Sequence, residues 1–408
     1  MHKSHRILRV LLLLALVAGS SYAVERSPAE AAKVAQQVLE RAIIVDTHED
    51  TPDAMWAGGY DLADPNSPMM VSIPKMREGF LGAAFFAIYV SANRPGGDFL
   101  HEAIDLFDLV YEQVGKHPEA LGLAFTANDV VRLHQQKRVA ILMGVEGGHM
   151  IENDLRILDI LYRLGGRYLT LTHSVSLDWA DSSTDKPRAH GLSDFGRQVV
   201  ARLNQLGMMV DISHVSDKTF SDALAVTKAP MIASHSSCRA LVDSPRNMTD
   251  DMIRALAQNG GVIQINFYSP YLDQPYGEAR KKVGDKRHAE IQAARQQYAG
   301  DPKRREDEIR KIDARYEAQL PVPSFKRIAD HIDHAVKVGG VDHVGLGSDF
   351  DGIDSAPRGM EDVSKLPTLV RELARRGYSE MDLEKILGGN VLRVMRRVEE
   401  ISHRSSKE

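Results

Sequence analysis

The stretch Ile43-Ile-Val-Asp-Thr-His-Glu-Asp50 begins as an apolar run typical of a buried strand and ends in side chains that bind metal ions. Alternate residues of a strand share one face, so His48 and Asp50 point the same way and are able to hold one cation together. A plain turn at the end of a strand would also account for a histidine and an aspartate here. The stretch alone leaves both interpretations open.

The same arrangement recurs at the ends of four other apolar runs. These runs are Val139 to Glu146, Met208 to His214, Pro230 to His235 and His343 to Asp349, and each closes on an imidazole or a carboxylate. Histidines that only satisfy a hydrogen bond in a core would be spread between the ends and the middles of strands. The pattern therefore predicts one site built at the C-terminal ends of several strands.

Eight apolar, β-branched runs are candidate strands. They lie at residues 43–47, 81–90, 139–145, 167–172, 208–213, 230–234, 261–267 and 343–348. Helical patterns at 155–164, 195–206 and 366–376 are each followed by a glycine that can end a helix. This alternation predicts a (β/α)8 barrel of TIM type, in which functional side chains stand at the C-terminal ends of the strands. A doubly wound α/β sheet is the alternative, and it would gather the ligands at one switch point.

The N-terminus carries the pattern of a secretory signal peptide at residues 1–23. Met1 to Arg9 is basic, Val10 to Ala18 is apolar and too short to span a membrane comfortably, and small residues follow at Ser21-Tyr-Ala23. We expect cleavage near Val24 and an exported protein, periplasmic or secreted, that is soluble once the signal is removed. An uncleaved membrane anchor is the alternative.

The rest of the chain is long enough for one large catalytic domain. We predict an N-terminal helix within 24–40, a single barrel domain over 41–400, and a charged helical insertion at 277–320. The insertion nearly lacks large apolar residues and is typical of two solvated helices broken at Gly300-Asp-Pro302. A surface hairpin is the simplest account. A lid or a dimer contact is the alternative, because the C-terminal loops of a barrel ring its active site.

Composition adds few constraints on partners. The formal net charge is −5, and the chain has no basic excess of the kind that binds nucleic acid, so no nucleic-acid partner is expected. Cys238 is the only cysteine, which leaves no internal disulfide. No stable membrane span is expected after removal of the signal, and a homodimer is compatible with the sequence.

The side chains at the strand ends point to metal-assisted hydrolysis. Imidazoles and carboxylates without a thiolate suit Zn²⁺, Mn²⁺ or another borderline divalent ion. Five ligands exceed one closed zinc shell, so two ions that share a water of lowered pKa are the economical arrangement. Glu146 suits the place between two ions because a carboxylate has two oxygens. Gly147 and Gly148 are expected to leave room there for ligands and substrate.

Seven short motifs resemble, in order, those of the membrane (renal) dipeptidase family of zinc peptidases. The motifs are Asp46-Thr-His-Glu-Asp50, Gly144-Val-Glu-Gly-Gly-His149, Leu169-Thr-Leu-Thr-His-Ser174, Asp211-Ile-Ser-His214, Ala233-Ser-His-Ser-Ser237, Arg246-Asn247 and Gly347-Ser-Asp-Phe-Asp-Gly352. The match runs from about residue 40 to residue 396. The resemblance implies a barrel related to the amidohydrolases and cleavage of dipeptides, with tolerance of a D-residue at the C-terminal position in several members.

By position, the resemblance implies a role for each of eight residues. His48 and Asp50 would bind the first zinc ion, His214 and His235 the second, and Glu146 would bridge them, giving two zinc ions per chain. Asp349 would act as acid and base and contact the substrate amine, His173 would stabilise the oxyanion, and Arg246 would hold the terminal carboxylate. Packing alone would also explain His173, and a surface ion pair would also explain Arg246.

The predicted function is therefore hydrolysis of a dipeptide substrate by a two-zinc enzyme, with a metal-bridging hydroxide as nucleophile. A related metallohydrolase that acts on a lactam, another amide or the dipeptide moiety of a biosynthetic intermediate would keep the same ligands. A non-enzymatic binding or maturation protein would be expected to lose a ligand or the aspartate, and the sequence keeps them all.

Three residues beside the motifs carry further expectations. Glu49 stands where many family members have asparagine, so this extra carboxylate is expected to change the metal affinity or the charge of accepted substrates. His149 is expected to support the metal ligands from outside, and Asp351 to be a loop residue.

Overall fold

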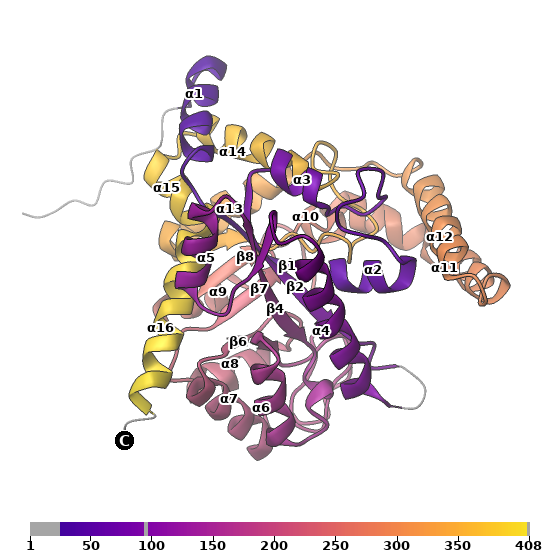
Figure 1. The fold of residues 1–408 in the computed structure, drawn as a ribbon, viewed down its shortest axis with the longest axis vertical. Coiled ribbons are helices and arrows are strands. Elements are labelled where there is room, and N and C mark those ends of the chain that lie inside the picture. The colour runs from indigo at the N-terminus through magenta and orange to yellow at the C-terminus, as the bar shows by residue number, and fades with distance from the viewer. Residues whose placement is uncertain (1–24, 94–96, 406–408) are drawn as a thin grey trace, which may run out of the picture.

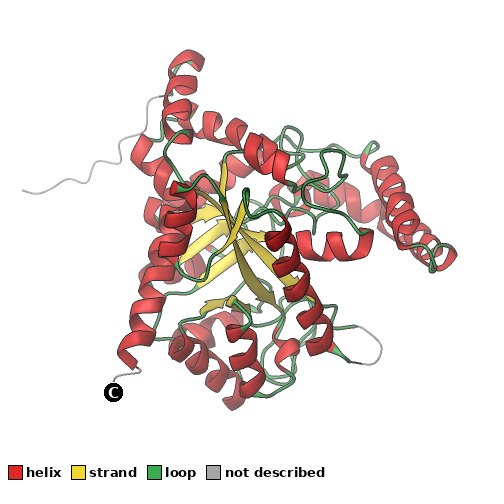
Figure 2. Cartoon of the chain, viewed as in Figure 1, coloured by secondary structure: helices red, strands yellow, loops and turns green. Residues whose placement is uncertain are grey.

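The computed structural model describes residues 25–93 and 97–405, so the signal peptide predicted at residues 1–23 lies outside the described residues. A ring of parallel strands occupies the centre of the fold (Figure 2). The ring consists of β1 (Ile44–Glu49), β2 (Leu81–Tyr89), β4 (Val139–Glu146), β5 (Gly166–Thr170), β6 (Met209–Asp211), β7 (Ile232–Ser236), β8 (Val262–Ile265) and β9 (Val344–Leu346). It closes where Leu346 of β9 pairs with Asp46 of β1. The predicted (β/α)8 barrel is confirmed.

A further strand, β3 (Leu121–Leu123), lies outside the ring and is absent from the sequence-based prediction. It pairs with residues 139–141 of β4, whereas residues 143–146 of β4 pair with β5. Because β2 occupies the other edge of β4, β3 extends the edge that β5 uses. Its three residues are too few to show an alternating pattern.

Helices surround the ring (Figure 1). They are α1 (Pro28–Leu39), α2 (Thr51–Gly58), α3 (Ile73–Glu78), α4 (Phe99–Lys116), α5 (Ala127–Gln135), α6 (Leu155–Arg163), α7 (Asp194–Leu206), α8 (Asp217–Val226), α9 (Asp250–Gln258), α10 (Ser269–Leu272), α11 (Gln274–Gln297), α12 (Pro302–Glu317), α13 (Lys326–Gly339), α14 (Leu366–Arg375), α15 (Glu380–Glu384) and α16 (Asn390–Ser405). Within residues 25–93 and 97–405, no helix combines the length and the apolar composition that a membrane crossing requires.

Local signals in the sequence fix the ends of these helices. In α7 the Ser193 side chain accepts a hydrogen bond from the Gly196 amide, which satisfies one of the free donors of the first turn. The helix ends at Gly207, whose φ of 78° is left-handed. This helix lies where the sequence pattern predicts it, from the Ser193 cap to Gly207.

The last helix closes the N-terminal end of the barrel. Arg393 in α16 donates hydrogen bonds to the carbonyl oxygens of Gly260 and Asp342, which precede β8 and β9. Val391 and Met395 of the same helix join Phe85 and other inward residues in one buried apolar cluster. This packing fills the barrel at the N-terminal ends of the strands, so their C-terminal ends form the open end.

The charged segment near 277–320 forms two helices, α11 and α12, that project beside α2 (Figure 1). Few of their side chains are buried, and polar contacts hold them to the barrel. Arg280 donates to Asp354 at 2.5 Å, and the Tyr276 hydroxyl lies 2.6 Å from Ser355 Oγ. Asp354 and Ser355 belong to the loop after β9, so the helix pair is fastened to a loop at the open end of the barrel.

We expect Glu372→Gln to lower the free energy of unfolding by about 1–3 kcal/mol near pH 7. Glu372 in α14 accepts hydrogen bonds from Arg375 and Arg376, and Arg376 also donates to Asp333 of α13. The bonds from Arg375 lower the pKa of Glu372 to about 2, from a usual value of 4.5, although burial opposes them. Because this pKa is depressed in the folded protein, the stabilisation is present above pH 4.5 and is lost as the pH falls towards 2.

Urea unfolding of the wild type and of Glu372→Gln over this pH range measures the effect. Glu40→Gln is the control, since Glu40 is exposed at the end of α1 and its replacement should change stability by less than about 0.5 kcal/mol. A difference between wild type and Glu372→Gln that stays constant down to pH 3 would contradict the role given to this carboxylate.

Candidate active site

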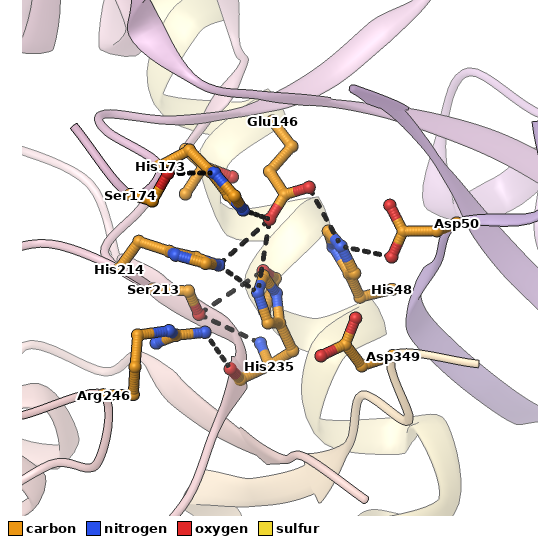
Figure 3. Close-up of polar contacts among 12 residues, drawn as sticks. His48, Asp50, Glu146, His173, Ser174, Ser213, His214, His235, Arg246 and Asp349 are labelled. Carbon is orange, nitrogen blue, oxygen red and sulfur yellow. Dashed lines mark hydrogen bonds and ion pairs between the residues drawn. The ribbon is translucent and has the colours of Figure 1, made fainter. Parts of the chain in front are cut away.

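The eight residues predicted to be functional lie at the open end of the barrel, and most of them form one cluster (Figure 3). His48 and His235 lie in β1 and β7, and Glu146 is the last residue of β4. The others follow their strands: Asp50 after β1, His173 after β5, His214 after β6, Arg246 in the loop after β7, and Asp349 after β9. A ring of parallel strands thus brings together residues far apart in the sequence.

Glu146 lies between two groups of ligands (Figure 3). Its Oε2 is 3.5 Å from Nε2 of His48, and Nε2 of His48 is 3.5 Å from Oδ2 of Asp50. Its Oε1 is 3.1 Å from Nε2 of His214 and 3.4 Å from Nε2 of His235. One carboxylate oxygen therefore faces His48 and the other faces His214 and His235, an arrangement that suits a carboxylate shared by two cations.

Hydrogen bonds fix the remaining ring nitrogens of two histidines. Nδ1 of His48 lies 2.7 Å from the Tyr168 hydroxyl, and Nδ1 of His235 lies 2.8 Å from Ser234 Oγ. Ser234 in turn donates to Asp211 at 2.7 Å. With Nδ1 engaged, the Nε2 atoms point into the cluster, where Nε2 of His235 lies 2.8 Å from Nε2 of His214. This orientation is usual for metal-binding histidines.

The donor set fits divalent cations. Three groups have ligand atoms within 4.8 Å of one another: His48, Glu146 and His235; Glu146, His173 and His214; and His48, Asp50 and Asp349. Nε2 of His48 is fully buried and has no hydrogen-bond partner among the described residues. Its nearest partners are carboxylate oxygens of Asp50 and Glu146, each 3.5 Å away, and a cation between these groups would satisfy all of them.

The protonation states of Glu146, His214 and His235 favour metal binding. His48 differs, because against the effect of burial Tyr168 and the nearby carboxylates raise its pKa well above the usual value. Although burial acts against ionisation, the charges of His48 and His173 and hydrogen bonds from His214 and His235 hold the pKa of Glu146 well below its usual value. Burial lowers the pKa of His214 and of His235 well below the usual range. An ionised carboxylate and neutral imidazoles are the forms that bind metal ions.

Two of the clustered residues have a strained backbone. His214 and Asp349 have φ values of 66° and 67°, in the left-handed region that non-glycine residues rarely adopt. Such conformations concentrate at functional sites, where the surrounding structure holds them. The strain therefore agrees with functional roles for both residues.

Asp349 has a partner that the sequence patterns do not reveal. Asn266 Nδ2, just after β8, donates to Asp349 Oδ2 at 2.8 Å. Burial, with Asp50 nearby, raises the pKa of Asp349 well above its usual value, so this carboxyl group can hold a proton. The run at 261–267 carries this asparagine next to its last residue, but an asparagine is neither of the ligand types, imidazole or carboxylate, that mark the other strand ends.

Arg246 carries donors that the described protein leaves free. The residue is 5% exposed, and its Nη2 donates to the carbonyl oxygen of His235 at 3.2 Å. Its Nε and Nη1 are buried and have no hydrogen-bond partner among the described residues. A buried guanidinium with two free nitrogens is suited to a carboxylate.

His173 stands at the edge of the cluster. Its Nε2 is 3.8 Å from Oε1 of Glu146, and its Nδ1 is 3.1 Å from Ser174 Oγ. Burial lowers its pKa, so the ring is neutral near pH 7 and can donate one N–H.

A cavity of about 530 Å³ opens above the cluster, and we call it the metal-side cavity. Glu146, His173 and His214 line its floor, and Asp53 of α2, Ile291 of α11 and Ile309 of α12 line its outer wall. Sequence patterns did not reveal this wall, because its residues reach the cavity only through the packing of α11 and α12 beside α2.

Two expectations about neighbouring residues are corrected. A Cβ at Gly147 would lie 2.4 Å from the His149 ring and one at Gly148 2.4 Å from Trp179, so protein side chains occupy the space expected for substrate. Glu49 is fully buried and does not line the metal-side cavity, so it does not act directly on the charge of the accepted substrate. Asp351 lies in the loop after β9 as expected, and it accepts hydrogen bonds from the Met70 amide and Thr51 Oγ1.

Comparison with known proteins gives consistent results. Residues 32–408 match the sequence model of the family described as membrane dipeptidase, peptidase family M19. The chain is 34% identical over 395 residues to an uncharacterized dipeptidase of Schizosaccharomyces pombe, with 91% of this chain and 84% of that protein covered.

Solved structures agree with the sequence comparison. The probable dipeptidase PvdM of Pseudomonas aeruginosa is 29% identical, with a TM-score of 0.77 over 92% of this chain and 100% of that one. A metallo peptidase of Rhodobacter sphaeroides, liganded with a phosphinate mimic of the dipeptide L-Ala-D-Ala, has the same fold. It is 24% identical, with a TM-score of 0.70 over 88% of this chain and 100% of that one.

Proposed function

This chain belongs to the membrane dipeptidase family of metal-dependent peptidases, and on that premise we propose that it hydrolyses dipeptides with two zinc ions bound at the open end of its barrel. The observation that carries the proposal is the position of Glu146. One of its oxygens faces His48, and the other faces His214 and His235.

The ligands divide into two sets around this carboxylate. His48 and Asp50 would hold one ion, His214 and His235 the other, and Glu146 both. Zinc ions bound there would supply a water of lowered pKa and a Lewis acid for the peptide carbonyl. Nitrogen and oxygen donors without thiolate also accept Mn²⁺, so another divalent ion could replace zinc.

The two ends of a dipeptide have separate partners in this site. Arg246 offers Nε and Nη1 to the terminal carboxylate, and these two nitrogens are otherwise unpaired in the described protein. The Asp349 carboxylate would form an ion pair with the free ammonium group at the other end. Holding both ends limits the substrate to a short length, which explains a preference for dipeptides.

The chemical step uses residues on both sides of the peptide bond. Asp349 takes a proton from the attacking water as the water oxygen bonds to the carbonyl carbon. His173 donates its N–H to the carbonyl oxygen as negative charge develops there. The carbon–nitrogen bond then breaks, and Asp349 returns the proton to the departing amine nitrogen. The products are two amino acids, and Asp349 regains its starting state.

Acceptance of a D-residue at the C-terminal position belongs to the same proposal. The similar fold of the Rhodobacter enzyme, bound to a mimic of L-Ala-D-Ala, supports including L-D pairs among the substrates tested.

Export of the protein is also proposed. The basic and apolar segments within residues 1–23 support removal of a signal peptide near Val24.

We expect purified protein to cleave members of a small panel of L-L and L-D dipeptides. Chelation should reduce the rate at least about a hundredfold, and added zinc should restore it, because the attacking water depends on the bound ions. Amino acid release, followed by chromatography with and without chelator, measures this. Undiminished cleavage after chelation would contradict the metal-dependent step, and no cleavage by fully metallated protein would redirect the search to other amides.

A further inference from the structure

A second cavity adjoins the metal-side cavity at Arg246. We call it the second chamber; its volume is about 510 Å³, within the range of about 300–1,000 Å³ typical of small-molecule sites. Arg246, Tyr268 and Tyr271 line both cavities. The site therefore continues past the arginine that is suited to bind the substrate carboxylate.

The position of Arg246 determines which part of a substrate reaches the second chamber. The side chain lies on the His214 and His235 side of the cluster, and Asp50 lies on the opposite side (Figure 3). Because Arg246 lines both cavities, a substrate carboxylate held by its guanidinium group would lie near the boundary between them. The amino-terminal half of the dipeptide extends from there towards Asp349, within the metal-side cavity.

We propose that the second chamber binds the side chain of the substrate's C-terminal residue, and that the enzyme prefers bulky aromatic or aliphatic residues at that position. The side chain leaves from the carbon that carries the carboxylate, and the second chamber opens at that place. This inference rests on the proposed dipeptidase function.

The inner wall of the second chamber is suited to an apolar guest. The rings of Tyr268 and Tyr271 meet edge to face with centroids 4.9 Å apart, a geometry that aromatic side chains favour. Val242, Pro245 and Pro270 also line this cavity. Among the charged lining residues, Arg280 is engaged by Asp354, whereas Asp243, Glu278 and Lys281 are exposed at the rim. Apart from Arg246, the described residues therefore offer no unpaired charged side chain on the inner wall that would attract a charged group of the substrate.

A glycine on α11 keeps the second chamber open. Gly277, Lys281 and Gly284 recur at helical spacing on one face of α11 and line this cavity, and Ile291 continues the same face into the metal-side cavity. A Cβ added at Gly284 would meet no atom within 4 Å, and the backbone there is ordinary helix. A larger side chain at this position would therefore fill the second chamber without disturbing its wall.

The test compares L-Ala-Gly with L-Ala-L-Phe as substrates of the zinc-loaded enzyme. The wild type should cleave L-Ala-L-Phe with the higher kcat/KM, because the phenyl ring gains a buried site. In Gly284→Leu the ratio of kcat/KM for L-Ala-L-Phe to that for L-Ala-Gly should fall at least about tenfold, since leucine occupies the space of the ring. Gly284→Ala and Gly284→Val should give intermediate ratios.

Gly115→Leu is the matched control. Gly115 lies within α4, a Cβ there also meets nothing within 4 Å, and the residue lines neither cavity. This variant should keep the wild-type ratio. If Gly284→Leu failed to fold, the alanine and valine variants would still carry the comparison.

The possible outcomes separate the inference from the function on which it rests. Cleavage of both dipeptides with a ratio that stays unchanged through the Gly284 series would overturn the role of the second chamber and leave the dipeptidase function intact. Failure of the zinc-loaded wild type to cleave either dipeptide would overturn the proposed function, and the inference with it.

Discussion

Replacing Glu146 with glutamine is expected to lower kcat/KM for a dipeptide by about a thousandfold or more, and to reduce the bound zinc to one ion per chain or none. The amide keeps the shape of the side chain but loses its negative charge and one of the two acceptor oxygens that face the histidines. Removing a partner outside the metal's own ligands already costs about 10–100-fold, so a ligand shared by two ions should cost more.

Zinc content and steady-state kinetics of the same preparation measure both effects. Glu112→Gln is a suitable control, because Glu112 is exposed on α4 and pairs with Lys116 of the same helix. If Glu146→Gln retained two zinc ions and most of the activity, Glu146 would not be the residue that joins the two metal positions.

The second large effect is expected for Asp349→Asn, which should lower kcat by about 10²–10⁴-fold with a smaller change in KM. Asparagine has the size of aspartate and can still meet Asn266, but it cannot accept a proton from water and return it to the amine. Measuring kcat, KM and zinc content separates this loss from a loss of metal, since Asp349 also lies near His48 and Asp50.

Arg246→Ala supplies the contrasting pattern in the same assay. It removes the free nitrogens offered to the substrate carboxylate, so KM should rise by about 10–100-fold while kcat changes less. Asp349→Asn protein that kept full turnover would refute the acid and base role. A fall in kcat without a rise in KM for Arg246→Ala would refute the carboxylate-binding role.

The fold and the cluster could be predicted because their signals are local. Each strand is recognisable from its own apolar run, and parallel strands place their C-terminal ends at one edge. His48, Glu146 and His235 therefore lie together in the structure, although they are far apart in the sequence and no local pattern links them. The motif resemblance carried the interpretation further, to a family that the comparisons confirm.

Features that depend on packing between distant segments could not be predicted in this way. The direction in which the Glu49 side chain points is one example. Its place beside His48 in the sequence suggests a charge near the metal ligands, whereas the side chain is buried away from the metal-side cavity. The charged composition of α11 is another, because it resembles that of a solvated helix. Only the packed structure reveals that one face of α11 lines two cavities.

The closure of the barrel between β1 and β9 has a consequence for how the protein becomes active. The Ser348 amide donates to Asp46 across a separation of 302 residues, and the Asp349 amide donates to the carbonyl oxygen of His48. Contacts of such long sequence separation form slowly, because the intervening chain must be ordered before they are made. A nascent or truncated chain that lacks β9 therefore has an incomplete ring of strands. Metal ions that bind only the complete ring stabilise only fully folded molecules.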